Sequence, residues 1–325
     1  MGTKKLCALP VRLYASAAAA SLLAAGPAAA ERFEANQLVF TDILGTVEIV
    51  TNGGDEIDVV VEQGKTYSRV SVGLDEEGRL IIAGEPRDEY ADDCCNRLIT
   101  RQANLRKDRT PNNDKKPSDA FFAEHPTIKV TMPRERDVSF VDARMKIAMG
   151  DIVGALDLDS CYAYGEIGDV EEAAIDLTPG SRLVVGDIGA ALELNVSGDA
   201  DVLTGDAAMV DVDMAGAGDV VLGSVDGVLD VSIAGSGNVR ATRLEGPLTA
   251  RIAGSGAVAV QGGRAEQMKV TIDGSGGVFF DGAVIGPELR LRGSSEVRMG
   301  SMTGSMKHAG GGEVYVGDKR IEPKE

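Results

Sequence analysis

A short pattern that recurs along the C-terminal half of the chain constrains the fold more than any other feature. Each copy has an alternating run of apolar and polar residues, a turn of small residues, and a second alternating run. The clearest turns read AGSGNV, AGSGAV and DGSGGV, and from Leu156 onward equivalent positions recur at intervals of about 19 residues. Nine copies at nearly constant spacing indicate a stack of similar units rather than a conventional globular core.

The alternation has a period of two, so each run is expected to be a strand with one buried face. In a stack of strands, equivalent residues lie about 4.8 Å apart, so nine coils would extend over roughly 40 Å. The sequence therefore predicts an all-β fold, a parallel β-solenoid with coils of about 19 residues. One predicted inward column consists of Leu158, Leu177, Val196, Met214, Ile233, Ile252, Ile272, Leu291 and His308. A second inward column follows the turns and consists of Leu183, Val202, Val220, Val239, Val258, Val278, Val297 and Val314.

Glycine is expected in the turns because a tight corner often needs a positive φ, which glycine adopts without steric cost. This explains the Gly-Ser-Gly triplets at 235–237, 254–256 and 274–276. A nucleophile elbow would need G-x-S-x-G between a strand and a helix with a histidine partner, and a dinucleotide site would need G-x-G-x-x-G opening a helix. Neither context fits the repeats, so the sequence predicts no catalytic and no cofactor-binding residues.

The repeated turns, with alternating hydrophobic residues on both sides, resemble the head GIN domain family of auto-transporter adhesins. Upstream, VEIVTNGGDEIDVVVE, GRLIIAG and TIKVTMP are similar to the opening strands of that family, so the resemblance runs from about Phe33 to Val316. It implies a right-handed β-helix on the exterior side of the inner membrane. It implies no catalytic residues.

The first 30 residues are predicted to be a signal peptide. Lys4, Lys5 and Arg12 give a basic start, an apolar run covers 15–25, and alanines at 28–30 supply a small-residue cleavage pattern. The apolar run is shorter than the roughly 20 residues that span a bilayer, so no transmembrane segment is expected in the mature chain. The predicted location is outside the cytoplasm, either in the periplasm or at the cell surface.

Net charge narrows the range of partners. The chain carries a formal charge of −18, and because the predicted signal peptide holds three cations and no anions, the mature chain would carry −21. Such a surface repels nucleic acid and anionic lipid, and it favours solubility and cationic partners. Nucleic-acid binding is therefore not expected.

The composition divides the mature chain into three parts. Residues 31–147 are expected to form irregular first coils, 148–317 the regular solenoid, and 318–325 a polar tail. A polar insertion at 85–126 interrupts the first part, and a short helix is expected within it at 97–107. Long insertions in solenoids emerge on one face and are often used for binding, although a tolerated surface loop is an equal alternative.

Strands are expected on both sides of the insertion. Glycines divide residues 37–83 into four or five strands, and 127–132 and 138–147 add two more.

Three cysteines remain after the predicted cleavage: Cys94, Cys95 and Cys161. In an exported protein a disulfide is plausible, either between Cys161 and one of the adjacent pair or as a Cys94–Cys95 bridge. Together with His125, the adjacent cysteines are poor zinc ligands because zinc sites usually separate two cysteines by two to four residues. No metal site is predicted.

One outward column of the predicted stack changes charge along its length. In coil order it reads Asp157, Asp176, Asn195, Asp213, Ser232, Arg251, Thr271, Arg290 and Lys307. One hypothesis is that this candidate pairing face binds an inverted copy of itself, with the acidic end against the basic end, in a homodimer. The alternative is a solvated face with a chance gradient, since surface ion pairs contribute little.

Three functions are compatible with these observations. The first is a non-enzymatic scaffold at the envelope or cell surface that binds an unknown protein or glycan, since the long faces of repeat proteins suit this role. The second is a carbohydrate-active β-helix enzyme, although aromatic platforms for sugars are scarce at 4 % aromatic content. The third is a periplasmic module of envelope-stress signalling.

Overall fold

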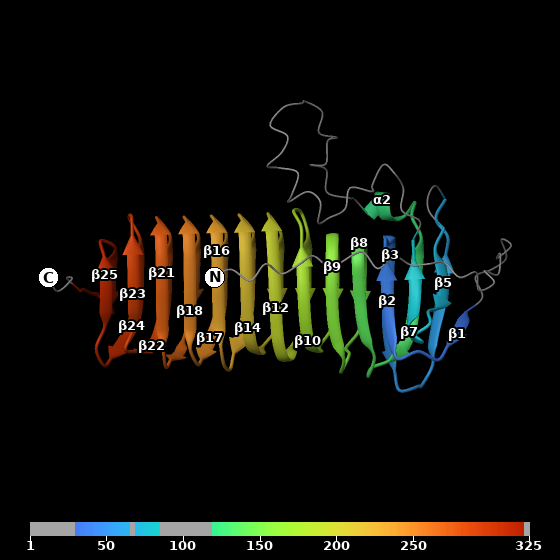
Figure 1. The fold of residues 1–325 in the computed structure, drawn as a ribbon, viewed down its shortest axis with the longest axis horizontal. Helices are drawn as coiled ribbons and strands as arrows, with labels where there is room; N and C mark the ends of the chain where they lie inside the picture. Colours follow the sequence, from blue (N-terminus) through green and yellow to red (C-terminus); the bar gives the residue numbers. More distant parts are fainter. Residues whose placement is uncertain (1–29, 66–68, 85–118, 322–325) are drawn as a thin grey trace, which may run out of the picture.

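The structure is a computed structural model that describes residues 30–65, 69–84 and 119–321. One short helix aside, the regular elements of these residues are strands, stacked side by side along one axis (Figure 1). Hydrogen bonds join the strands into one continuous sheet, wound into about nine parallel coils of about 19 residues. The predicted all-β solenoid is therefore confirmed. No helix in the described ranges is long and apolar enough to cross a bilayer.

Each regular coil gives one strand to each of two long faces. The first strands of the coils build what we call the charged face: β10 (Val170–Leu177), β12 (Ile188–Gly198), β14 (Ala207–Gly216), β16 (Leu229–Gly235), β18 (Leu248–Gly254), β21 (Met268–Gly274), β23 (Glu288–Arg292) and β25 (Lys307–Gly310). The strands after the turns build the second face: β11 (Arg182–Val185), β13 (Asp201–Thr204), β15 (Asp219–Val225), β17 (Asn238–Glu245), β19 (Ala257–Val260), β22 (Gly277–Ile285), β24 (Glu296–Thr303) and β26 (Glu313–Val316). The long strand β9 (Ala155–Ile167) pairs with the first strands of both faces, and β20 (Gly263–Ala265) pairs with β17 and β22 beyond the second face.

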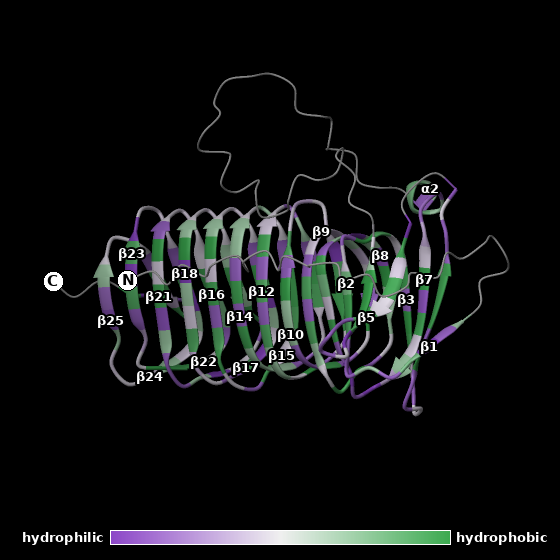
Figure 2. Ribbon diagram, turned by 45° about the vertical axis from the view of Figure 1, so that its right-hand side comes forward, coloured by the Kyte–Doolittle hydropathy of each residue, from purple (hydrophilic) through white to green (hydrophobic). Residues whose placement is uncertain are grey.

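The inward side chains form continuous hydrophobic columns. Hydrophobic and hydrophilic residues alternate along the ribbons of the strands (Figure 2). The predicted column from Leu183 to Val314 is confirmed at every step, because each residue pairs with its counterpart one coil later. All eight side chains are at most 3 % exposed. Since burial of one such side chain contributes roughly 1.5–3 kcal/mol, these stacked columns are a main source of stability.

The other predicted inward column is correct from Leu177 to Leu291 but wrong at both ends. Leu158 pairs with Ile175, and Leu291 pairs with Gly310. His308 does occupy an inward position, but in the neighbouring column, where it pairs with Leu289. Counting from the turn fails at these two places because the number of residues between the two faces changes there.

The turn between the two faces needs glycine for steric reasons. At Gly235 and Gly254, φ is 141° and 132°, in the region that side chains disfavour. A Cβ on either residue would lie less than 3.0 Å from the carbonyl oxygen of the glycine one coil earlier. The glycine column therefore permits the coils to stack at strand spacing.

The N-terminal region continues both faces with less regular strands: β1 (Glu31–Phe33), β2 (Gln37–Thr41), β3 (Leu44–Asn52), β4 (Ile57–Glu62), β5 (Ser71–Leu74), β6 (Leu80–Ala83), β7 (Thr127–Pro133) and β8 (Asp137–Met149). The five strands between 37 and 83, and the two after the insertion, are confirmed. The strand β8 pairs with β2, β3 and β9, and a bulge at Asp142, whose φ is 53°, interrupts its register with β9.

Antiparallel strands close the N-terminal end. The strand β4 pairs antiparallel with both β1 and β7, and β5 pairs antiparallel with β6. The helix α2 (Asp119–Phe122) lies beside this region: Phe122 is buried against Tyr162, and Asp119 forms an ion pair with Lys146 at 2.8 Å. The last residues of the predicted polar insertion are thus packed structure, whereas the helix expected at 97–107 lies outside the described residues.

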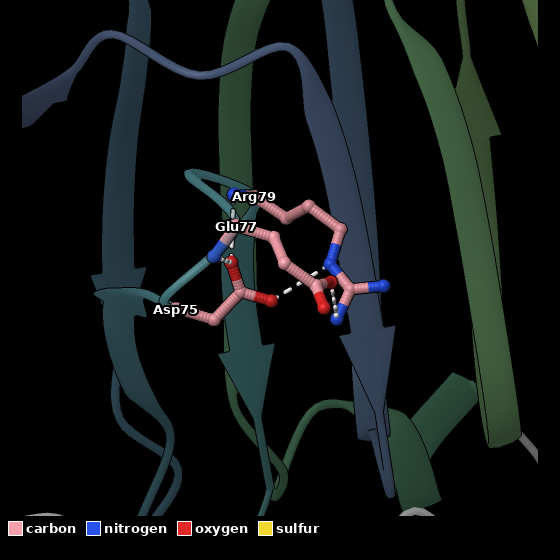
Figure 3. Close-up of polar contacts among 3 residues, drawn as sticks. All are labelled: Asp75, Glu77 and Arg79. Carbon is pink, nitrogen blue, oxygen red and sulfur yellow. Dashed lines mark hydrogen bonds and ion pairs between the residues drawn. The ribbon is translucent and has the colours of Figure 1, made fainter.

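The hairpin between β5 and β6 is held by one carboxylate (Figure 3). Asp75 accepts hydrogen bonds from the backbone N–H groups of Glu77 and Arg79 at 3.0 and 2.9 Å. The Arg79 guanidinium contacts both Asp75 and Glu77 at 2.7 Å. Burial raises the pKa of Asp75, but these hydrogen bonds outweigh it and hold the pKa below its usual range.

The C-terminal end has a smaller cover. The strand β27 (Lys319–Arg320), within the predicted polar tail, turns back and pairs antiparallel with β26. The last strand of the charged face, β25, pairs on one side with β23. The described part of the tail thus covers the edge of the second face.

Candidate binding faces

The register of the parallel strands sets which side chains meet on the charged face. Two adjacent outward columns run along the middle of this face. Column A reads Asp159, Asp176, Asn195, Asp213, Ser232, Arg251, Thr271, Arg290 and Ala309. Column B reads Asp157, Ala174, Glu193, Asp211, Asp230, Thr249, Lys269, Glu288 and Lys307. The predicted pairing face needs one correction: Asp157 and Lys307 belong to column B, whereas Asp176, Asp213, Arg251 and Arg290 share column A as expected.

The charge gradient is present in both columns. The first five coils carry acids and no cations in these columns, and the cations begin at Arg251. Two contacts join neighbouring coils: Arg251 binds Asp230, and Lys307 binds Glu288, each at 2.7 Å. Among the described residues, Asp176 and Arg290 make no ion pair within 4.0 Å. The face therefore has an acidic end and a basic end whose charges are only partly neutralised within the chain.

Carboxylates crowd the acidic end. Burial, and to a smaller extent the charges of Asp142, Asp176 and Asp157, raise the pKa of Asp159 to about 6. Burial and the charge of Asp176 also raise the pKa of Asp157. Like charges stacked at strand spacing cost free energy, so a cation placed over this corner would relieve the repulsion.

A ladder of aspartates, where the chain passes from the second face to the charged face of the next coil, was not predicted from the sequence. The carboxylates of Asp151, Asp169, Asp187 and Asp206 each accept a hydrogen bond, at 2.6–3.0 Å, from the backbone N–H of the matching residue one coil later. The glycine before each matching residue leaves room for the carboxylate. The recurring Gly-Asp pairs were the available signal. The ladder is structural, and no group of three metal-ligating side chains occurs among the residues with described positions.

The second face carries a column of exposed apolar side chains. Val184, Leu203 and Val221 follow one another in an outward column and are each more than a third exposed. The same column continues through Arg240 and Ala259 to a set that we call the aromatic end, namely Phe279, Arg298 and Tyr315.

At the aromatic end the rings lie against the sheet. A Cβ on Gly277 would approach the Phe279 ring to 2.7 Å, so this ring lies back over the glycine of its own strand. The Arg298 guanidinium lies 4.4 Å from the centre of the Tyr315 ring. Flat rings beside a cation and the carboxylates of Glu296 and Glu313 can stack on apolar ligand surfaces and donate or accept hydrogen bonds.

The predicted disulfide is partly visible. Cys161 is disulfide-bonded, and its partner lies outside the described residues, as do Cys94 and Cys95. The pairing therefore stays a prediction. His125 is buried beside α2, and its Nδ1 lies 2.7 Å from the carbonyl oxygen of Phe121.

These observations define the class of protein as a parallel β-solenoid with two long exposed faces. The resemblance to an adhesin family is confirmed, because residues 171–261 match the family described as "Putative auto-transporter adhesin, head GIN domain". The matched segment covers coils of the regular array. Among curated proteins, none matches the chain.

One solved structure aligns along most of the chain. It is a crystal structure of a "putative cell adhesion protein" from Clostridium sporogenes, and the alignment covers 89 % of this chain and 98 % of that chain. The identity is 11 % and the TM-score 0.17, values too low to show a shared fold.

Proposed function

We propose that the protein is a non-enzymatic, exported scaffold that binds a protein or glycan at the cell surface. The observation that carries the proposal is the match of residues 171–261 to the adhesin head family. These coils carry Val184, Leu203 and Val221, whose exposed side chains form a continuous apolar strip on the second face. Long flat faces with scattered apolar and aromatic contacts suit binding to extended surfaces.

Location is the first test of this function. Intact cells are treated with a protease and blotted with an antibody against residues 106–119. Loss of the full-length band in intact cells, while a cytoplasmic marker stays whole, is the expected result. Protection until the outer envelope is permeabilised would place the protein in the periplasm and contradict surface adhesion.

The second face supplies the binding test. Replacing Leu203 with Asp places a charge in the apolar strip and is expected to weaken binding of the purified protein to cells about tenfold, the scale of one hot-spot residue. Phe279→Ala tests the aromatic end in the same assay. A matched control is Val153→Asp, because Val153 is also exposed but lies outside the strip. Equal binding by all three variants and the original protein would exclude this face.

A carbohydrate-active enzyme is the second candidate, and one observation favours it. Asp159, with a pKa of about 6, lies near other carboxylates, and a protonated acid beside an ionised one is what glycoside hydrolysis requires. Reducing-sugar release from polysaccharides, lost in Asp159→Asn, would support the enzyme and contradict the scaffold. The aromatic end lies on the other face, which favours the scaffold.

A further inference from the structure

The observed register gives the hypothesis of an inverted pairing on the charged face a definite set of contacts. If a second copy of the face is laid on the first with its coils in reverse order about β16, acidic residues of columns A and B lie opposite basic residues of the same column. In column A, reversal places Asp213 opposite Arg251 and Asp176 opposite Arg290. In column B it places opposite charges together twice more, Asp157 with Lys307 and Glu193 with Lys269.

We propose that the charged face is the interface of a homodimer in which a second copy lies face to face on it, inverted about an axis along β16. A two-fold rotation about a line parallel to a strand turns the face over and reverses the stacking direction. It keeps the strand direction, so each column faces itself in the partner. Ser232 then lies opposite Ser232 at the centre.

The acidic residues Asp230 and Glu288 are compatible with this arrangement. Asp230 would face its own copy, and its ion pair with Arg251 at 2.7 Å offsets this repulsion only in part, because the same guanidinium faces Asp213 of the second copy. Glu288, which is bound to Lys307 in the same chain, would face Ala174. Asp230 with its own copy is the one like-charge pair that the inverted order creates in the two columns.

Small side chains at the centre permit a close approach. Beside column A, the three middle coils present the exposed alanines Ala215, Ala234 and Ala253, stacked in register. Sheets that pack face to face lie about 10 Å apart, a gap that an arginine and an aspartate can bridge together.

The alternative packing, with both copies stacked in the same direction, would place acidic coils on acidic coils. The crowded carboxylates near Asp159 would then gain further repulsion instead of the cation Lys307 of an inverted copy. Charge complementarity therefore selects both the second copy as occupant and the inverted order. A cationic partner protein would satisfy the acidic end but would leave Lys269 and Arg290 without partners.

Sedimentation velocity tests the dimer at ionic strengths of about 0.01 M and about 1 M, where the Debye lengths are about 30 and 3 Å. A dimer at low ionic strength that dissociates at high ionic strength is expected. A monomer at low ionic strength would overturn the proposal.

Charge swaps test the register. Asp176→Arg and Arg290→Glu each put like charges together twice per dimer, so each variant alone is expected to be monomeric. A mixture of the two is expected to form a heterodimer, because both contacts then join opposite charges. The chain that carries both changes is expected to dimerise again. Arg264→Glu, which reverses an exposed charge away from the charged face, is the matched control and should remain dimeric.

The swaps have decisive outcomes. Single variants that stay dimeric would place the interface elsewhere, and a mixture that stays monomeric would contradict the inverted register. Thermal unfolding by circular dichroism confirms that each variant is folded. The dimer does not rest on the proposed adhesion, because cell binding by the second face is measured separately and either result can fail alone.

Discussion

The regular coils and the N-terminal region differ in how the edges of their strands are paired. From β10 onward each coil pairs parallel with the coils before and after it, and one glycine column at the turn keeps the spacing. The N-terminal region covers the exposed edge of the stack with antiparallel strands, a bulge at Asp142 and the helix α2. Repetition therefore stabilises the middle, whereas special contacts are needed where repetition stops.

Glycine substitutions in the two regions should show the largest difference in stability between them. Gly254 and Gly78 both have positive φ, 132° and 73°. A Cβ on Gly254 would collide with the carbonyl of Gly235, whereas a Cβ on Gly78 would meet nothing within 4 Å. We predict that Gly254→Ala destabilises the protein by about 3 kcal/mol or more, since the strain of the backbone adds to a clash in a close-packed stack.

Gly78→Ala is the matched variant and should cost only about 1 kcal/mol, the conformational term alone. Urea unfolding followed by circular dichroism measures both. Equal losses for the two variants would mean that the glycine column does not set the stacking distance.

The Asp75 hairpin tests the N-terminal cover. Asp75→Ala removes the acceptor of two backbone hydrogen bonds and the partner of Arg79, so we expect a loss of about 1–2 kcal/mol, confined to β5 and β6. Hydrogen exchange of the amides in these strands should accelerate, while exchange in β16 should not change. Asp75→Asn, which keeps one acceptor oxygen, should lose less.

The pH dependence of the same hairpin follows from its lowered pKa. A carboxylate whose pKa is lower in the folded state stabilises the fold above its unfolded value of about 3.9, and this contribution is lost as the pH falls through the folded pKa. Exchange of the hairpin amides in the original protein should therefore approach that of Asp75→Ala as the pH falls through the folded pKa of Asp75.

Asp159 marks the junction between the two regions, and its charge is expected to be unfavourable. Its pKa of about 6 lies above the unfolded value of about 3.9, so the penalty is present above pH 6 and is relieved as the pH falls toward 4. We predict that Asp159→Asn raises stability at pH 7 by about 1 kcal/mol, after allowance for solvent screening. Calorimetry at pH 7 and pH 4 measures the difference.

Asp159→Asn should raise stability more than Asp157→Asn does. The advantage of Asp159→Asn should vanish near pH 4, because the original side chain is then protonated. Asp157→Asn should show the same direction with a smaller size. A penalty that stays constant with pH would show that the carboxylate charge is not its cause.

The sequence predicted the middle of the molecule better than its ends for a physical reason. Between Leu177 and Leu291 every coil repeats the same turn, so counting from the turn finds each inward residue and the outward residues of column A. In the last coil the turn is two residues shorter, because Leu291 pairs with Gly310 while Glu296 pairs with Glu313. Because the prediction aligned the coils on the turn, it assigned Lys307 and His308 to the wrong columns.

The contacts of the N-terminal region were not predictable in the same way. Antiparallel pairing of β4 with β1 and β7 depends on contacts between distant segments, which have no repeat to reveal them. The aspartate ladder was visible in the sequence as Gly-Asp pairs. The hydrogen bonds that join each aspartate to the next coil could be assigned only from the register of the strands.

His308 provides the smallest and most local test of the comparison. It takes the inward position that Leu289 holds one coil earlier, and both ring nitrogens are buried without a hydrogen-bond partner among the described residues. Unpaired buried polar atoms cost free energy, so His308→Leu should stabilise the last coil by up to about 1 kcal/mol. Hydrogen exchange of the β23 amides, which pair with β25, should slow, while exchange in the hairpin of β5 and β6 should not change. His308→Ala, which leaves the column unfilled, is the matched control. If His308→Leu accelerates exchange in β23, the open end of the stack depends on the histidine rather than on continuing the hydrophobic column.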